Sequence, residues 1–155
     1  MWKKWKPYII SILIALAVGG LAAFLTRGNM NVYDTLNRPP LAPPAILFPI
    51  VWGILYVLMG ISAAMIYEER YEQEVTGALV VYGLQLIVNF FWSLIFFNMQ
   101  AYLFATVWLA LLWVLVLWMI VRFYKTKPLA AYLQIPYLVW LTFAFYLSLM
   151  VFLLN

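Results

Sequence analysis

The chain of 155 residues contains no cysteine and no histidine, and it has only five acidic residues. Without cysteine there is no disulfide and no thiol nucleophile, and without histidine there is no imidazole base and no usual zinc ligand set. All the carboxylates fall in expected loops or at the ends of apolar segments: Asp34, Glu68, Glu69, Glu72 and Glu74. We therefore expect no metal site, no obligatory cofactor and no conventional catalytic arrangement.

Charge of either sign is scarce. Only 9% of the residues are charged, against about 25% in an average soluble domain. No Asp, Glu, Lys or Arg occurs between Val75 and Val121, and so long a segment cannot form the surface of a soluble protein. The net charge of +4 comes from basic residues at the ends of apolar segments, which indicates membrane anchoring and not a nucleic-acid partner. The composition predicts an integral membrane protein surrounded by lipid.

Five apolar runs are long enough to cross a bilayer core of about 30 Å as helices. Barrel strands would be about 10 residues long with alternating polarity, whereas these runs are about twice as long and apolar on all sides. We expect an all-α membrane protein, a bundle of five transmembrane helices that forms a single domain over residues 1–155. The expected spans are Tyr8–Thr26, Ala45–Tyr67, Gly77–Phe97, Ala101–Phe123 and Leu129–Leu154.

The positions of Lys and Arg predict the orientation, because cytoplasmic loops carry an excess of these residues. With five spans, the N-terminal segment and the second and fourth loops share one side, and they hold most of the basic residues: Lys3, Lys4, Lys6, Arg70, Arg122, Lys125 and Lys127. The other side holds Arg27 and Arg38. We expect a cytoplasmic N-terminus, with the first loop and the C-terminus outside. The first run follows basic residues as in a signal peptide, but it has no clean cleavage site, and we expect it to be retained as a helix.

Polar side chains inside membrane spans are costly and therefore informative. Gln85 and Asn89 lie four residues apart in the third span, on the helix face that also carries Tyr82, Trp92 and Phe96. Two interpretations have similar weight. The amides hydrogen-bond neighbouring helices, or they line a buried pocket and orient a polar group of a ligand.

Large aromatic residues share faces with small ones in other spans. The second span places three aromatic residues on neighbouring turns: Phe48, Trp52 and Tyr56. The fifth span, beyond Pro136, carries a stripe with Ser148 beside it, formed by Trp140, Ala144 and Leu147. A small residue between large ones can leave a hollow for a flat ligand, although spacing alone favours ordinary packing. In the first span, small residues at spacing four suit close helix contact, within the bundle or in a homodimer: Ala15, Gly19 and Ala23.

The first loop concentrates proline. Residues 37–52 read NRPPLAPPAILFPIVW and contain five of the eight prolines. Proline fixes its own φ near −65° and disfavours helix in the residue before it, so we expect a stiff, extended loop, with Pro44 as the first helical position of the second span. Such a loop would cap the mouth of the bundle, hold Tyr33 in place and pre-form one wall of a pocket, which lowers the ordering cost of binding.

Three motifs carry a resemblance to a known family. They are YDTLNRPPLAPPAILFPIVWGILY in the first loop and second span, LQLIVNFFWSLIFF in the third and IPYLVWLTFAFYLSLMVFLLN in the fifth. In this order and spacing they resemble the translocator protein family, whose members are also called tryptophan-rich sensory proteins or peripheral benzodiazepine receptors. The resemblance implies a five-helix bundle, often dimeric, with a pocket under the first loop. Members bind porphyrins such as protoporphyrin IX, haem, sterols in some branches, and isoquinoline-carboxamide or benzodiazepine drugs.

The resemblance also implies a set of pocket residues. Carried over by motif, Trp52, Asn89, Trp92, Trp140 and Ala144 would line the pocket together with Tyr33 from the loop, and the faces described above add Phe48, Tyr56 and Leu147. We expect a membrane receptor or sensor for a flat apolar tetrapyrrole; the alternatives are transport of tetrapyrroles or sterols and light-dependent porphyrin degradation, for which Trp52 and Trp140 would be the residues to suspect.

Two departures from the family pattern concern the fifth span. Phe145 stands where many members have Thr, and the chain ends at Asn155 without the tail that carries the sterol motif in animal members. These departures put sterol binding in doubt and favour a bacterial member over a mitochondrial one.

Overall fold

The computed structural model describes residues 2–29, 32–37, 39–44 and 46–155. Within them, five helices are long and apolar enough to cross a membrane, which confirms the expected all-α five-helix architecture. They are α1 (Trp2–Thr26), α3 (Leu47–Glu68), α4 (Thr76–Ser93), α5 (Tyr102–Thr126) and α6 (Pro128–Leu154). A π-helix, η2 (Leu94–Asn98), extends α4. Each helix overlaps its predicted span, and α1 begins six residues earlier than expected because the helix includes the basic N-terminal segment and continues through Pro7.

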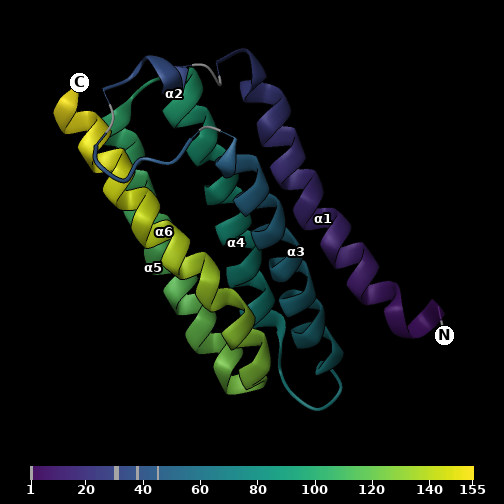
Figure 1. Cartoon of the computed structure of the whole chain (residues 1–155). Coiled ribbons are helices and arrows are strands. Elements are labelled where there is room, and N and C mark those ends of the chain that lie inside the picture. The colour runs from purple at the N-terminus through teal and green to yellow at the C-terminus, as the bar shows by residue number, and fades with distance from the viewer. Residues whose placement is uncertain (1, 30–31, 38, 45) are drawn as a thin grey trace.

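The helices form one bundle, and the two chain ends lie at its opposite ends (Figure 1). Helices α3 to α6 pack side by side, and α1 crosses the outside of the bundle against α3 and α4. The crossing is closest at Gly60, where an added Cβ would lie 2.8 Å from the backbone nitrogen of Ile12. The small-residue groove of α1 faces inward at this contact, since Ala15 is fully buried. This end of the groove therefore packs within the bundle, whereas Ala23 at its other end is exposed.

Local chemistry fixes the turns at the end of the bundle that carries the N-terminus. Pro128 opens α6 at its first position, and Lys127 before it is extended, as a residue before proline prefers. Between α3 and α4, Glu74 accepts a hydrogen bond of 2.7 Å from the backbone N–H of Thr76. The bonds that Glu74 receives from Thr76 lower the pKa of this carboxyl. Lys127 also lies 3.5 Å from Glu69, which joins the two turns.

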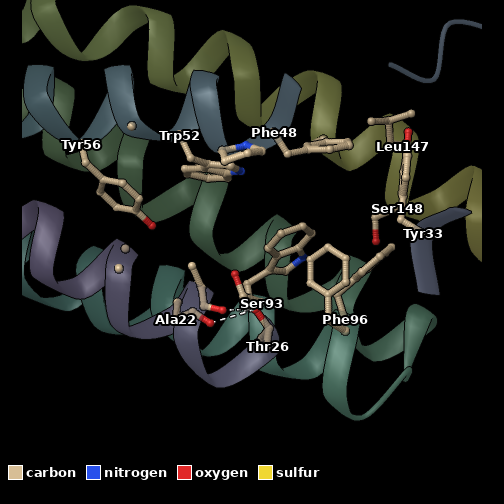
Figure 2. Close-up of a pocket in the computed structure, with 18 of the residues that line it drawn as sticks. Ala22, Thr26, Tyr33, Phe48, Trp52, Tyr56, Ser93, Phe96, Leu147 and Ser148 are labelled. Carbon is tan, nitrogen blue, oxygen red and sulfur yellow. Dashed lines mark hydrogen bonds between the residues drawn. The ribbon is translucent and has the colours of Figure 1, made fainter. Parts of the chain in front are cut away.

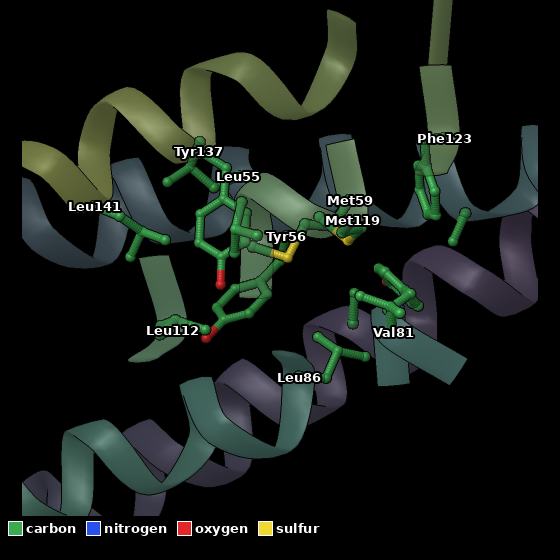
Figure 3. Packing of buried hydrophobic residues seen from close by; sticks show 14 of the residues in the cluster. Leu55, Tyr56, Met59, Val81, Leu86, Leu112, Met119, Phe123, Tyr137 and Leu141 are labelled. Carbon is green, nitrogen blue, oxygen red and sulfur yellow. The ribbon is translucent and has the colours of Figure 1, made fainter. Parts of the chain in front are cut away.

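The centre of the bundle is packed with aliphatic and aromatic side chains (Figure 3). The largest fully buried residues come from α3 to α6 and include Met59, Leu109, Phe123, Tyr137 and Leu141. Helix α1 contributes mainly small buried residues at its contact with this core. The described core between α3 and α6 is thus filled by large side chains, whereas α1 packs against it with small ones.

The first loop, residues 27–46, is folded and not simply extended. It contains the short helix α2 (Val32–Thr35) and a tight turn in which the N–H of Ala42 donates to the carbonyl of Pro39. Leu41 sits in this turn at φ 74°, a left-handed conformation that costs about 1–2 kcal/mol for a residue with a side chain. Helix α3 begins at Leu47, so the prediction that Pro44 is the first helical position was wrong. Pro44 instead accepts a hydrogen bond from Leu47 and leads into the helix.

Hydrogen bonds tie this loop to the C-terminal half of α6. Asn37 donates its backbone N–H to the side-chain oxygen of Asn155 at 3.2 Å, and Asn155 returns a bond of 3.0 Å to the carbonyl of Asn37. The hydroxyl of Tyr146 donates to the carbonyl of Pro40 at 2.9 Å. The loop therefore lies across the end of the bundle, where Figure 1 shows it passing over the helix ends.

Candidate ligand-binding cavity

A cavity of about 300 Å³ lies beneath the first loop, between α1 and the other helices. Its wall draws on α1, α2, α3, the junction of α4 with η2, and α6, whereas α5 contributes no lining residue among those described. Figure 2 shows Phe48, Trp52 and Tyr56 on one side, with Ser93 and Phe96 facing them across the space. The volume is at the lower limit of the roughly 300–1,000 Å³ typical of small-molecule pockets.

A continuous series of aromatic rings forms the α3 side of the cavity. The ring centroids are 5.0 Å apart between Tyr33 and Phe48 and 5.7 Å apart between Trp52 and Tyr56. Trp140 joins these pairs from α6, at 5.9 Å from Phe48 and 6.4 Å from Trp52. Aromatic pairs in this distance range stabilise one another. The wall is therefore apolar and held by mutual packing, mostly edge to face, and only Trp52 and Tyr56 lie near parallel, at 30° between their planes.

A chain of buried hydrogen bonds closes the inner end of the cavity. The hydroxyl of Tyr56 donates to Asn89 at 2.6 Å, and the amide of Asn89 donates to the hydroxyl of Tyr137 at 2.7 Å. Tyr137 then donates to Gln85 at 2.7 Å. Figure 3 shows Tyr56 and Tyr137 entering the same part of the core from α3 and α6. The two amides of the third span thus join α3, α4 and α6, as the first of the two sequence interpretations supposed.

Most polar groups on the cavity wall have partners inside the protein. Tyr33 donates to the carbonyl of Pro43 at 2.7 Å, Thr26 to the carbonyl of Ala22 at 2.9 Å, and the hydroxyl of Ser148 lies 2.7 Å from that of Thr106. The indole N–H of Trp92 differs, because it is buried and has no hydrogen-bond partner in the part of the chain that the structure describes. No charged residue is among the described lining residues.

The structure brings together seven of the nine residues that the sequence suggested for a ligand site. They are Tyr33, Phe48, Trp52, Tyr56, Trp92, Ala144 and Leu147. Asn89 and Trp140 do not line the cavity, and their expected place in its wall is corrected here. The side-chain amide of Asn89 hydrogen-bonds two tyrosines, since its oxygen accepts from Tyr56 and its nitrogen donates to Tyr137. The ring of Trp140 contacts the rings of Phe48 and Trp52. That these residues bind a ligand stays a prediction.

Sequence reasoning missed most of the wall opposite Trp52. It comprises small residues of α1 and aromatic residues at the end of α4: Gly19, Gly20, Ala22, Ala23, Thr26, Phe96 and Phe97. The spacing of Ala15, Gly19 and Ala23 was a usable signal, since small residues that let two helices approach also leave space where the helices diverge. Phe96 had a signal too, since it shares the helix face of Gln85 and Asn89, but the sequence did not indicate the π-helix that presents it together with Phe97. Single turns of π-helix are rare in proteins, and those that occur are often found at functional sites.

Comparison with known proteins bears on this geometry. Residues 11–154 match the model of the TspO/MBR family. The chain belongs to this family. It is 35% identical to the tryptophan-rich protein TspO of Chlorobaculum tepidum, over 100% of this chain and 99% of that protein. It is 33% identical to the translocator protein of Bos taurus, over 93% of this chain and 87% of that protein. It is also 36% identical to protein CrtK of Rhodobacter capsulatus, over 96% and 92% respectively.

Membership of the TspO/MBR family confirms the resemblance drawn from the three sequence motifs. Together with the five long apolar helices, it identifies the chain as an integral, multi-pass membrane protein of the sensor and translocator type. The aromatic wall, the loop that covers it and the hydrogen-bonded floor are therefore features of a TspO/MBR protein, and the cavity they enclose is the candidate site of that protein.

Proposed function

We propose that this protein is a membrane receptor that binds a flat apolar tetrapyrrole, protoporphyrin IX or haem, in the cavity beneath the first loop. The observation that carries the proposal is the aromatic wall of Phe48, Trp52 and Tyr56, which faces a space with no charged lining residue among those described. A planar conjugated ring system stacks on such a wall and buries apolar area. Hydrophobic drug-like molecules with one or two ring systems meet the same requirements.

One polar contact would orient the ligand. Trp92 presents a buried N–H without a partner among the described residues, and porphyrin carboxylates or ring nitrogens are acceptors for such a donor. Leaving the indole unsatisfied costs free energy, so a ligand that accepts from it gains relative to one that does not. Apolar molecules that lack an acceptor should bind less tightly.

The size of the cavity adds a condition. At about 300 Å³ it is small for a macrocycle. The cavity can widen on the side of α1, because the lining residues there are small. Gly20 and Ala23 both line the cavity and are exposed, so the core does not hold this side closed. Binding of a porphyrin would therefore move α1 or the first loop outward, whereas a two-ring drug would enter with less change.

The buried hydrogen bonds below the cavity favour a receptor over a transporter. The chain from Tyr56 through Asn89 to Tyr137 joins three helices below the cavity with hydrogen bonds of 2.6 and 2.7 Å. A through-path for a tetrapyrrole would have to break this buried chain. We also propose that the N-terminus is cytoplasmic, and that the first loop and the C-terminus face outward, because basic residues predominate on the N-terminal side.

The test is a titration of the purified protein with protoporphyrin IX, read by quenching of tryptophan fluorescence. Ala144→Phe places a ring in the cavity and should weaken binding at least tenfold. Ala17→Phe is the matched control, because it adds the same ring on an exposed part of α1 outside the cavity and should leave binding unchanged. Equal binding by both variants, or equal partition of porphyrin into empty vesicles, would refute the proposal.

A second candidate function is the light-dependent oxidation of a bound porphyrin by dioxygen. It is favoured by one observation, the contact of Trp52 with Trp140 at 6.4 Å between ring centroids. The excited macrocycle would pass its energy to dioxygen, and the reactive oxygen so formed would add to the macrocycle; Trp52 at the wall and Trp140 behind it would hold the macrocycle where this reaction occurs. Trp52→Phe and Trp140→Phe should then lower the yield of product under light while porphyrin binding persists. An unchanged yield in both variants would exclude this role.

A further inference from the structure

A second hollow lies at the other end of the bundle, near the N-terminus. It has a volume of about 630 Å³ and is formed by α1, the last turns of α3 and the first turns of α4. Its mouth carries the basic residues Lys3, Lys6 and Arg70, whereas its deeper walls are mostly apolar and include Ile10, Ile14, Ala63 and Leu79. We call it the N-terminal groove. It shares no lining residue with the cavity under the first loop.

The cations of the N-terminal groove are not neutralised by the protein. Lys3 and Lys6 have no ion pair with any residue that the structure describes, and no acidic residue is among the described lining residues. Arg70 lies over the ring of Tyr67 at 4.0 Å and donates to its carbonyl at 3.0 Å. These contacts fix the guanidinium at the mouth and leave its charge without a counterion.

The nearby glutamates are engaged elsewhere. Glu68 accepts a hydrogen bond from Tyr8, Glu69 pairs with Lys127 at 3.5 Å, and Glu74 accepts from the backbone of Thr76. Glu72 is exposed in the same loop and does not line the groove. None of these four glutamates is among the described lining residues, so the cations that line the mouth face the groove without a carboxylate beside them.

The depth of the groove excludes a simple anion as its whole occupant. Ile14 lies eight residues beyond Lys6, which is about 12 Å along a helix. On the inner wall, Tyr82 is only 8% exposed, and its hydroxyl lies beside the side chain of Ser11, so the two hydroxyls form a small polar spot in an otherwise apolar wall. A molecule that fills the groove thus needs a negative group at the mouth, a polar atom near Tyr82 and an apolar chain beyond.

We propose that the N-terminal groove binds one anionic phospholipid. Its phosphate lies at the mouth between Lys3, Lys6 and Arg70, an ester oxygen accepts from the hydroxyl of Tyr82, and an acyl chain follows the apolar wall of α1. The groove opens at the level of α1 where the chain leaves the membrane, so a lipid of that leaflet enters without leaving the bilayer. Juxtamembrane Lys and Arg residues attract anionic lipids in the same way.

The experiment counts the lipids that stay bound to the detergent-purified protein by native mass spectrometry, after incubation with phosphatidylglycerol or phosphatidylcholine. The wild type should retain phosphatidylglycerol in preference to phosphatidylcholine. The double variant Lys3→Gln/Lys6→Gln should lose roughly tenfold or more of its affinity for phosphatidylglycerol. Lys4→Gln/Lys125→Gln removes the same charge from exposed positions outside the groove and should retain the lipid as the wild type does.

Tyr82→Phe tests the inner wall separately. Removal of the hydroxyl should lower retention of phosphatidylglycerol by more than any loss of thermal stability in the lipid-free protein explains, because the ester oxygen of the lipid loses its donor while the hydroxyl of Ser11 remains. Equal retention of both lipids by the wild type, or an equal loss in the two charge variants, would overturn the proposal. Full retention by Tyr82→Phe would also contradict it.

Discussion

Two adjacent glycines of α1 allow a sharp test of how the cavity wall is built. Gly19 and Gly20 occupy the same helix, so replacing either with alanine gains the same helix propensity, about 1 kcal/mol. Their surroundings differ. A Cβ at Gly20 would meet nothing within 4 Å, whereas a Cβ at Gly19 would overlap the ring of Tyr56, whose Cζ would lie at 2.9 Å. Figure 2 shows Tyr56 reaching from α3 toward α1.

The ring of Tyr56 cannot easily move away. Its hydroxyl is bonded to Asn89 at 2.6 Å and its face lies against Trp52. Overpacking of this kind costs about 1–3 kcal/mol, and loss of the buried hydrogen bond adds about 0.5–1.5 kcal/mol. We expect Gly20→Ala to stabilise the protein by about 1 kcal/mol and Gly19→Ala to be about 1.5–4.5 kcal/mol less stable than Gly20→Ala.

The assay is reversible unfolding in detergent, followed by circular dichroism. A second background sharpens it, because Tyr56→Ala removes the obstructing ring. In that background Gly19→Ala and Gly20→Ala should have the same effect. If the two alanine variants of the otherwise unchanged chain are equally stable, the contact of Gly19 with Tyr56 does not limit the packing of α1, and the reasoning fails.

Two further predictions concern the floor and the loop. Tyr137→Phe removes one donor and one acceptor from the buried chain of hydrogen bonds and should destabilise the protein by about 1–3 kcal/mol in the same unfolding assay. The control is Tyr132→Phe, at a 53% exposed position, which should change stability by less than about 0.5 kcal/mol. Similar values for both variants would contradict the assigned hydrogen bonds. Asn155→Ala removes the bonds to Asn37 and should raise the rate of amide exchange in residues 32–37 at least severalfold without a loss of helix content; unchanged exchange would show that the bonds to α6 do not hold the loop.

Most of the fold could be predicted from the sequence, because the bilayer imposes a simple rule. Each span needs about 20 apolar residues with internal hydrogen bonds, and the five runs met that condition within a few residues. The helix ends were less certain. The prediction for Pro44 failed because Pro44 accepts a hydrogen bond from Leu47 ahead of the helix, and sequence patterns place element boundaries only to within about two to four residues.

The candidate site was only partly visible in the sequence. Periodicity placed Phe48, Trp52 and Tyr56 on one face, and these residues do line the cavity. The same periodicity could not predict that Asn89 lies behind the cavity wall, because its position depends on hydrogen bonds with the hydroxyls of Tyr56 in α3 and Tyr137 in α6. The contribution of α1 was missed because the spacing of Ala15, Gly19 and Ala23 indicated a close helix contact but not the place where α1 diverges from the core and leaves space.

Binding of a ligand in the cavity under the first loop is tested most directly by hydrogen–deuterium exchange in the presence of protoporphyrin IX. Saturating porphyrin should slow amide exchange in residues 32–44 and in the first turns of α3 around Trp52, and it should leave α5, which contributes no described lining residue, unchanged. Protection confined to α5 or to the N-terminal end of α1, with none in residues 32–44, would contradict the account.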